Sequence, residues 1–105
     1  MQPERPRAHR YSFIATVELT DLQFGIQMKE QTSDLSLFGC HVNTLKPWLA
    51  GTRVRIRITH RGAIFAAFGR IAYVQPNVGM GIFFTGIEKK DELTLEKWIV
   101  ELREQ

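Results

Sequence analysis

The segment TSDLSLFGCHV at residues 32–42 places an acid, a hydroxyl and a glycine within a few positions of one another. The carboxylate of Asp34 could accept hydrogen bonds from a ligand, and the hydroxyl of Ser36 could donate or accept one. Gly39 would let the backbone turn and approach a ligand closely. The segment is therefore either an ordinary polar corner between two strands or one wall of a ligand site.

Arginines gather in two parts of the chain. The first ten residues, MQPERPRAHR, contain Arg5, Arg7 and Arg10 against a single acid. A second cluster, with no acid among its members, comprises Arg53, Arg55, Arg57 and Arg61. The formal charge of +3 and its uneven distribution point to an anionic partner, such as a phosphate ligand, nucleic acid or an acidic protein surface. Solvated arginines on exposed faces would explain each cluster equally well.

The sequence does not contain a recognisable catalytic or metal-binding pattern. Its histidines are scattered, and no nucleophile-elbow, zinc-protease or phosphate-loop motif is found. Cys40 and His41 are adjacent, but neighbours on a strand point to opposite faces, and no second cysteine completes a zinc set. We therefore expect Cys40 to fill the core beside an exposed His41. We expect neither an enzyme nor a metal or cofactor site.

Hydrophobic alternation predicts the elements that must position these residues. Residues 52–59, TRVRIRIT, are the clearest case, because every second side chain is aliphatic and the others include three arginines. Residues 11–20 alternate in the same way, with Phe13 and Val17 on the buried side. The complete set of expected strands is 11–20, 25–32, 40–44, 52–59, 63–74 and 80–85.

Local signals complete the predicted fold. Arg61-Gly62 indicates a tight hairpin, and Gly69 indicates a bulge or bend inside a long strand. After Gly86 the spacing becomes helical, with a stripe formed by Leu95, Trp98, Ile99 and Leu102. Six short strands and a terminal helix, without βαβ alternation, predict an all-β antiparallel barrel whose helix covers an open end or face.

The expected organisation is one domain with a short arm. Residues 1–10 are predicted to be a flexible basic arm, and residues 11–105 to be the barrel with its C-terminal helix. The single cysteine suits a reducing compartment. The N-terminus lacks an apolar signal segment, and no run approaches the roughly 18 apolar residues of a membrane span. A soluble cytoplasmic protein is the default expectation.

The residue types of segment 32–42 and of the basic segment 1–10 together suit a guanine nucleotide. An arginine fork can bind phosphate oxygens or the O6 and N7 atoms of guanine. A carboxylate can accept hydrogen bonds from the N1–H and N2–H₂ edge of the same base. A serine hydroxyl can serve phosphate or base.

These residues and their spacing resemble those of the PilZ domain family. The family has one signature, Asp/Asn-x-Ser-x-x-Gly, entering the third strand, and the residues Asp34-Leu35-Ser36-Leu37-Phe38-Gly39 match it in full. The likeness continues through residues 69–74, GRIAYV, and residues 79–84, GMGIFF, into the helix. The sequence departs from the other family signature, which is Arg-x-x-x-Arg ahead of the first strand. Pro6 stands four residues before Arg10, and arginines lie on either side of it.

The resemblance implies a six-stranded antiparallel PilZ-like β-barrel with a C-terminal α-helix. It also implies a receptor for the second messenger cyclic di-GMP that passes the signal to an effector protein whose identity the sequence does not reveal. Asp34 and Ser36 should then lie near the barrel surface beside the arm. The ligand-binding residues carried over from the family are Arg5, Arg7, Arg10, Asp34, Ser36 and Gly39.

Two other interpretations stay open. The altered arginine spacing is compatible with a PilZ-like adaptor that no longer binds the nucleotide and acts through protein contacts alone. A small-barrel nucleic-acid binder would use the arginines at 53, 55 and 57. That stripe lacks interleaved aromatic side chains for base stacking, which makes nucleic acid an unlikely partner.

Overall fold

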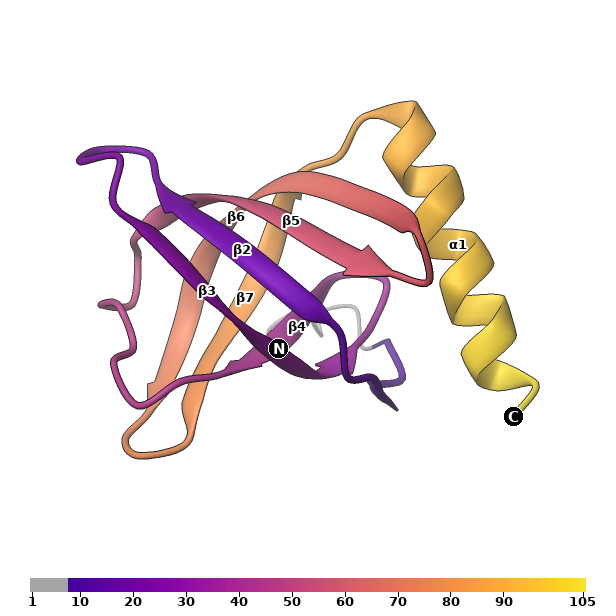
Figure 1. Cartoon of the computed structure of the whole chain (residues 1–105), viewed down its shortest axis with the longest axis horizontal. Coiled ribbons are helices and arrows are strands. Elements are labelled where there is room, and N and C mark those ends of the chain that lie inside the picture. The colour runs from indigo at the N-terminus through magenta and orange to yellow at the C-terminus, as the bar shows by residue number, and fades with distance from the viewer. Residues whose placement is uncertain (1–7) are drawn as a thin grey trace, which may run out of the picture.

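The computed structural model describes residues 8–105, and in this range seven strands precede one helix (Figure 1). The strands are β1 (Tyr11–Ser12), β2 (Thr16–Asp21), β3 (Gln27–Leu35), β4 (Gly39–Asn43), β5 (Arg53–His60), β6 (Ala63–Gln75) and β7 (Gly79–Gly86). The helix, α1, spans Lys89–Arg103. It is too short and too polar to cross a membrane, and the described residues contain no other helix that could.

The strands form a closed antiparallel barrel. Their order is β1-β3-β2-β5-β6-β7-β4, and β4 pairs back onto β3. The ring therefore contains six strands, and the short β1 is added to β3 outside it. This confirms the predicted barrel with a C-terminal helix, with one additional strand.

The additional strand arises because the predicted strand at 11–20 is broken between Ser12 and Thr16. Thr32, a fully buried residue of β3, lies opposite the break. Its hydroxyl donates a hydrogen bond to the carbonyl of Phe13 at 2.6 Å and accepts one from the amide of Ala15 at 3.0 Å. The Thr32 side chain adds to two backbone bonds across the break, from the amide of Phe13 to the carbonyl of Ser33 and from the amide of Thr32 to the carbonyl of Ala15, so both halves stay attached to β3. The predicted inward face is nevertheless correct, because Phe13 and Ala15 are buried and Ile14 is exposed.

The long β5–β6 hairpin follows the local signals in the sequence. Arg61 and Gly62 both have positive φ, 50° and 80°, which is typical of the tight two-residue turns that match strand twist. The pairing of β6 with β7 shifts register between Phe68 and Gly69, where the sequence predicts a bulge. A second shift lies between Ile71 and Tyr73. These irregularities bend β6 around the barrel.

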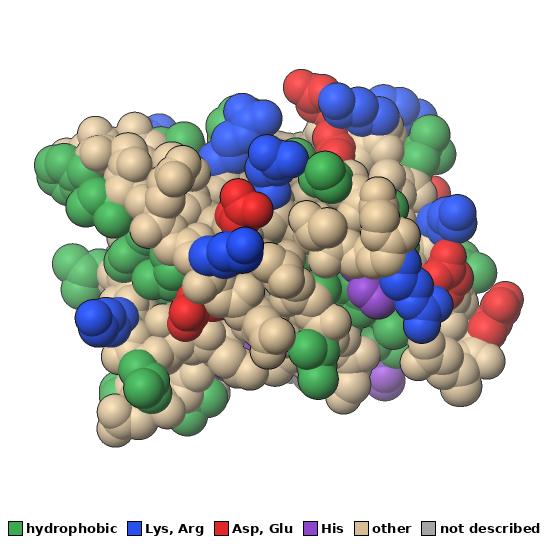
Figure 2. All heavy atoms as spheres, viewed as in Figure 1, with side chains coloured by type: hydrophobic (Ala, Val, Ile, Leu, Met, Phe, Trp, Pro, Cys, Tyr) green, Lys and Arg blue, Asp and Glu red, His purple; other side chains and the backbone are tan. Residues whose placement is uncertain are grey.

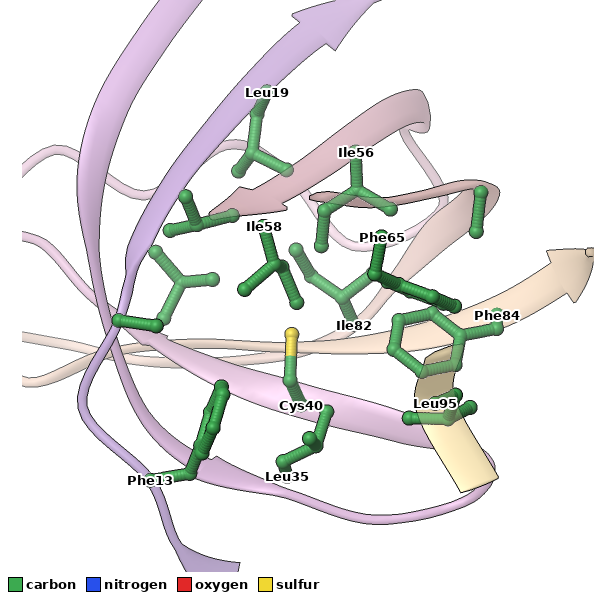
Figure 3. Packing of buried hydrophobic residues seen from close by; sticks show 14 of the residues in the cluster. Phe13, Leu19, Leu35, Cys40, Ile56, Ile58, Phe65, Ile82, Phe84 and Leu95 are labelled. Atoms are coloured by element: carbon green, nitrogen blue, oxygen red, sulfur yellow. The ribbon is translucent and has the colours of Figure 1, made fainter. Parts of the chain in front are cut away.

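The core fills the inside of the barrel and extends under the helix (Figure 3). The inward side chains of β5 are fully buried, as the alternation predicts. Cys40 is buried and its sulfur points into this cluster (Figure 3). Burial raises the pKa of the Cys40 thiol, so it stays protonated and behaves as a small apolar side chain.

The helix closes one side of the barrel with the predicted stripe. Leu95, Trp98 and Ile99 are buried and Leu102 is partly buried. The ring of Trp98 packs against that of Phe13 with centroids 5.5 Å apart. Burying such a side chain is worth several kcal/mol, which anchors α1.

The first turn of α1 also covers a free strand edge. The pairing of β7 with β6 ends at Gly86, opposite Phe68, so the preceding part of β6 has no partner strand on that side. Asp91 is buried there, and its carboxylate accepts a hydrogen bond from the amide of Ala66 at 2.9 Å. The acid therefore satisfies a strand donor as well as suiting the helix N-terminus.

Candidate ligand-binding site

The connection between β3 and β4 is a tight turn held by Ser36. The Ser36 hydroxyl accepts hydrogen bonds from the amides of Phe38 and Gly39 at 3.1 and 3.2 Å. The amide of Ser36 donates in turn to the carbonyl of Gly39 at 2.8 Å. Ser36 is consequently 8% exposed, and its side chain fixes the shape of the turn.

Gly39 opens β4, directly opposite Phe83 of β7. A Cβ atom at this position would overlap the carbonyl oxygen of Ile82 and lie 3.1 Å from its carbon. Because these are backbone atoms, they cannot rotate away. The glycine of the Asp-x-Ser-x-x-Gly pattern is thus required by the approach of two strands.

Asp34 lies on β3 and joins three segments of the chain. Its Oδ2 accepts a hydrogen bond from Nη2 of Arg10 at 2.7 Å, and its Oδ1 accepts one from the amide of His41 at 3.0 Å. The Arg10 side chain is 50% exposed and that of Asp34 is 23% exposed. Solvent therefore screens the ion pair in part, and both groups remain accessible to a ligand.

Tyr73 holds the other side of the arginine. Nη2 of Arg10 also donates to the phenol oxygen of Tyr73 at 3.1 Å. This hydrogen bond, with a further contribution from Asp34, raises the pKa of the Arg10 guanidinium against the opposing effect of its partial burial. Arg10 thus stays fully charged, with its guanidinium placed between a carboxylate and a phenol.

The position of Tyr73 depends on a glycine across the sheet. Tyr73 of β6 pairs with Gly81 of β7, immediately after the second register shift. A Cβ atom on Gly81 would overlap the Tyr73 ring, so the ring lies over a position that only glycine leaves open. The phenol thereby reaches Arg10.

His41 corrects a prediction made from the sequence. It was expected to be exposed, but it is 5% exposed. Its ring nitrogens lie 2.9 Å from Oγ of Ser33 and 3.0 Å from Oε1 of Gln75. The expectation is wrong because the barrel brings Ser33 of β3 and Gln75 of β6 over the His41 ring, and the sequence around His41 contains neither. Within residues 8–105 no three acidic, histidine or cysteine side chains gather closely enough to hold a metal ion.

A hollow of about 960 Å³ opens beside these residues, between the β3–β4 turn, β6 and β7. Its lining includes Arg10, Ser36 and Gly39, and Asp34 adjoins it through the bond to Arg10. The structure thus brings four of the predicted site residues together, with Arg10 and Asp34 partly exposed and Ser36 buried in its turn. The other two, Arg5 and Arg7, lie outside the described residues.

Two further side chains at this hollow were missed from the sequence. Tyr73 and Arg70 both line it, on β6. Both belong to the GRIAYV segment, but nothing in the segment itself shows that they line this hollow together with Arg10. That follows from the bulged register of β6 against β7. For Tyr73, the sequence offered one hint: this tyrosine could lie opposite a glycine of the neighbouring strand, as it does with Gly81.

Comparison with known proteins decides the family. The PilZ domain model matches residues 4–101. The chain belongs to the PilZ domain family. PilZ domains are receptors for cyclic di-GMP and are generally non-catalytic. No curated protein matches the sequence significantly.

Solved structures share the PilZ fold of this chain. The PilZ domain of CeSA from a cellulose synthesizing bacterium is 24% identical, with a TM-score of 0.73, covering 90% of this chain and 98% of that one. The PilZ domain of YcgR from Escherichia coli, solved with c-di-GMP, is 19% identical, with a TM-score of 0.73 and coverages of 96% and 93%. The longer YcgR chain, also in complex with c-di-GMP, gives 18% identity and a TM-score of 0.78, covering 96% of this chain and 47% of that one.

Proposed function

We propose that this PilZ domain binds cyclic di-GMP at the hollow beside Arg10 and passes the signal to a partner protein. The observation that carries the proposal is the bonded set of Arg10, Asp34 and Tyr73, placed next to the turn that Ser36 holds. A fixed arginine, an accessible carboxylate and an aromatic ring suit a ligand with phosphates and guanine bases. The similar YcgR domain was solved with c-di-GMP.

Arg10 and Asp34 have hydrogen-bonding capacity left for the ligand. Arg10 uses only Nη2 in its two bonds, so its remaining N–H groups can bind a phosphate or the Hoogsteen edge of guanine. Asp34 accepts one bond on each oxygen, and a carboxylate offers about four acceptor positions, so it can still accept from guanine N1–H and N2–H₂. The Ser36 hydroxyl accepts from two amides and donates to the carbonyl of Gly39 at 3.3 Å, so Ser36 would shape the turn beside the ligand and could donate to a phosphate oxygen only by giving up its bond to Gly39.

The basic arm completes the proposed site. We propose that residues 1–10 form the arm, that residues 11–105 form the domain, and that Arg5 or Arg7 adds a second guanidinium when the arm folds over the nucleotide. Pro6 occupies the position where the family has an arginine, and it restricts Arg5 to extended backbone conformations. One charge-assisted hydrogen bond contributes about 1.5–3 kcal/mol. Affinity should therefore be weak, and should rise about tenfold to a hundredfold in Pro6→Arg.

Calorimetric titration with cyclic di-GMP tests the proposal. Asp34→Ala should abolish binding, because it removes the acceptor for guanine and the shorter of the two hydrogen bonds that hold Arg10. Glu96→Ala is the matched control, since it removes one exposed carboxylate from the helix. Thermal melts of both variants establish that the fold persists. Normal binding by folded Asp34→Ala would refute the proposed site.

The second candidate is an adaptor that has lost the nucleotide and acts through protein contacts alone. The observation that favours it is Pro6, which breaks the arginine spacing of the family. This candidate predicts no heat of binding with either the natural sequence or Pro6→Arg, while both melt cooperatively. Binding by the natural sequence would exclude it, whereas binding by Pro6→Arg alone would show that Pro6 is what prevents nucleotide binding.

A further inference from the structure

A row of arginines runs along the outer face of β5. Arg53, Arg55 and Arg57 are exposed, while the alternate residues of the strand are fully buried. Side chains two residues apart on a strand are about 7 Å from each other. None of the three forms an ion pair with another residue in the 8–105 range. The row therefore presents guanidinium groups at regular spacing, and the acid beside it is Glu18 of β2, directly opposite Arg57.

An apolar row lies beside the arginines, on β6. Arg55 pairs with Phe68, Arg57 with Ala66 and Thr59 with Ile64. Ile64 and Phe68 are each 46% exposed. The guanidinium carbon of Arg55 lies 5.7 Å from the centre of the Phe68 ring, in a cation–π arrangement. This contact holds Arg55 against the surface and reduces the entropy that a partner must overcome to use it.

The two rows border a hollow of about 840 Å³ between β2, β3, β5, β6 and the first turns of α1. Lys29 and Lys90 add positive charge to its lining. Two acids also line it. Glu18 of β2 lies opposite Lys29 of β3 on one side and opposite Arg57 of β5 on the other. Asp91 is buried and accepts the hydrogen bond from the amide of Ala66. Figure 2 shows Lys and Arg side chains gathered over β2 and β5, with an acidic side chain among them.

This composition favours a protein partner over nucleic acid. A nucleic-acid backbone is a continuous row of phosphates that cannot avoid Glu18 beside Arg57, whereas a peptide can place an uncharged side chain next to that acid. Single strands also need free aromatic faces for stacking, and the ring of Phe68 is already occupied by Arg55. Protein interfaces, by contrast, combine an apolar strip with charged groups. An extended peptide repeats its side chains on one face every two residues, which matches the spacing of Arg55 and Arg57.

We propose that this β5–β6 face, formed by Arg55, Arg57, Ile64 and Phe68 with the adjoining hollow, is the surface through which the domain binds an acidic segment of a partner protein. The segment carries carboxylates two residues apart with apolar side chains among them. None of the residues lining this hollow lines the one beside Arg10. The two surfaces can therefore be occupied together, so that one receives the ligand and the other carries the output.

The test uses short fluorescent peptides and anisotropy. The first peptide repeats Glu-Leu-Glu-Ser; the second replaces Leu by Ser; the third replaces Glu by Lys. Arg55→Gln/Arg57→Gln should weaken binding of the first peptide about three- to tenfold, since each exposed ion pair contributes modestly. The matched control, Lys97→Gln/Arg103→Gln, removes the same charge from exposed helix positions and should leave binding unchanged.

A second variant tests the apolar row. Ile64→Thr should weaken the Leu-containing peptide and leave the Glu-Ser peptide unaffected, which a purely electrostatic surface would not do. Three results would overturn the proposal: no binding of the first peptide, equal losses in the two Gln pairs, or tighter binding of a random single-stranded oligonucleotide that Arg55→Gln/Arg57→Gln removes. Cyclic di-GMP titration of the same Gln pairs separates this face from the nucleotide site, because neither pair should alter it.

Discussion

Gly39→Ala should destabilise the domain even without any ligand. The added methyl would overlap the Ile82 carbonyl oxygen and lie 3.1 Å from the Ile82 carbon and 3.3 Å from Cα of Phe83. Since every obstacle is backbone, β4 must move away from β7 and weaken the pairing of Gly39 with Phe83 and of Cys40 with Ile82. Overpacking lowers the free energy of unfolding by about 1–3 kcal/mol. Because the surroundings of Gly39 are rigid backbone, we expect Gly39→Ala to cost about 2–3 kcal/mol.

For a domain of this size, that loss corresponds to a fall of about 8–24 °C in melting temperature. Gly86→Ala is the matched control, because its Cβ would lie 3.8 Å from Phe68, at ordinary contact distance. The control should melt at the wild-type temperature or slightly above it, since alanine restricts the unfolded chain. Circular dichroism melts of the three proteins provide the comparison. Equal melting temperatures for the two variants would refute the argument that strand approach requires this glycine.

Three further predictions concern the helix, pH and the hydrogen bond between Arg10 and Tyr73. Trp98→Ala should cost about 3–5 kcal/mol in denaturant unfolding, and Val100→Ala, on the exposed side of α1, less than about 1 kcal/mol; equal costs would rule out a packed helix. Burial lowers the pKa of His60 in the folded state, so the unfolded chain takes up the proton first and stability should fall as pH drops below about 6.5. His60→Gln should lose less stability between pH 7.5 and pH 5.5, and parallel losses would contradict this role. Tyr73→Phe keeps the ring but leaves Arg10 held by Asp34 alone, so cyclic di-GMP should bind about two- to tenfold more weakly at an unchanged melting temperature, and unchanged affinity would contradict a role for the Tyr73–Arg10 hydrogen bond.

Alternation and turn residues predict most of this fold. The inward aliphatic residues of β5, the Arg61-Gly62 turn and the bulge at Gly69 depend on near neighbours in the chain, so the sequence contains their signal. The break in the first strand could not be predicted from near neighbours, because it involves a hydrogen bond from Thr32, which is far along the chain. The burial of His41 likewise depends on which strands flank β4.

The candidate site likewise contains residues that the sequence predicts and residues that only the structure reveals. Asp34, Ser36 and Gly39 form one local pattern, which can be read directly from the sequence. The third partner in the Arg10 cluster, Tyr73, depends on its register against Gly81 and on a bulge that offsets the pairing. The role of Asp91 also needed the structure, because the amide of Ala66 is available only where β7 ends.

The most direct test of the proposed receptor site is an amide chemical-shift titration of the isotope-labelled protein with cyclic di-GMP. The amides of Phe38 and Gly39 donate to Ser36, and the amide of His41 donates to Asp34, so they report on the groups proposed to bind the ligand. The largest shifts should fall on these three amides and on Arg10. Shifts confined to β2 and β5, or no shifts at a large excess of nucleotide, would contradict the site.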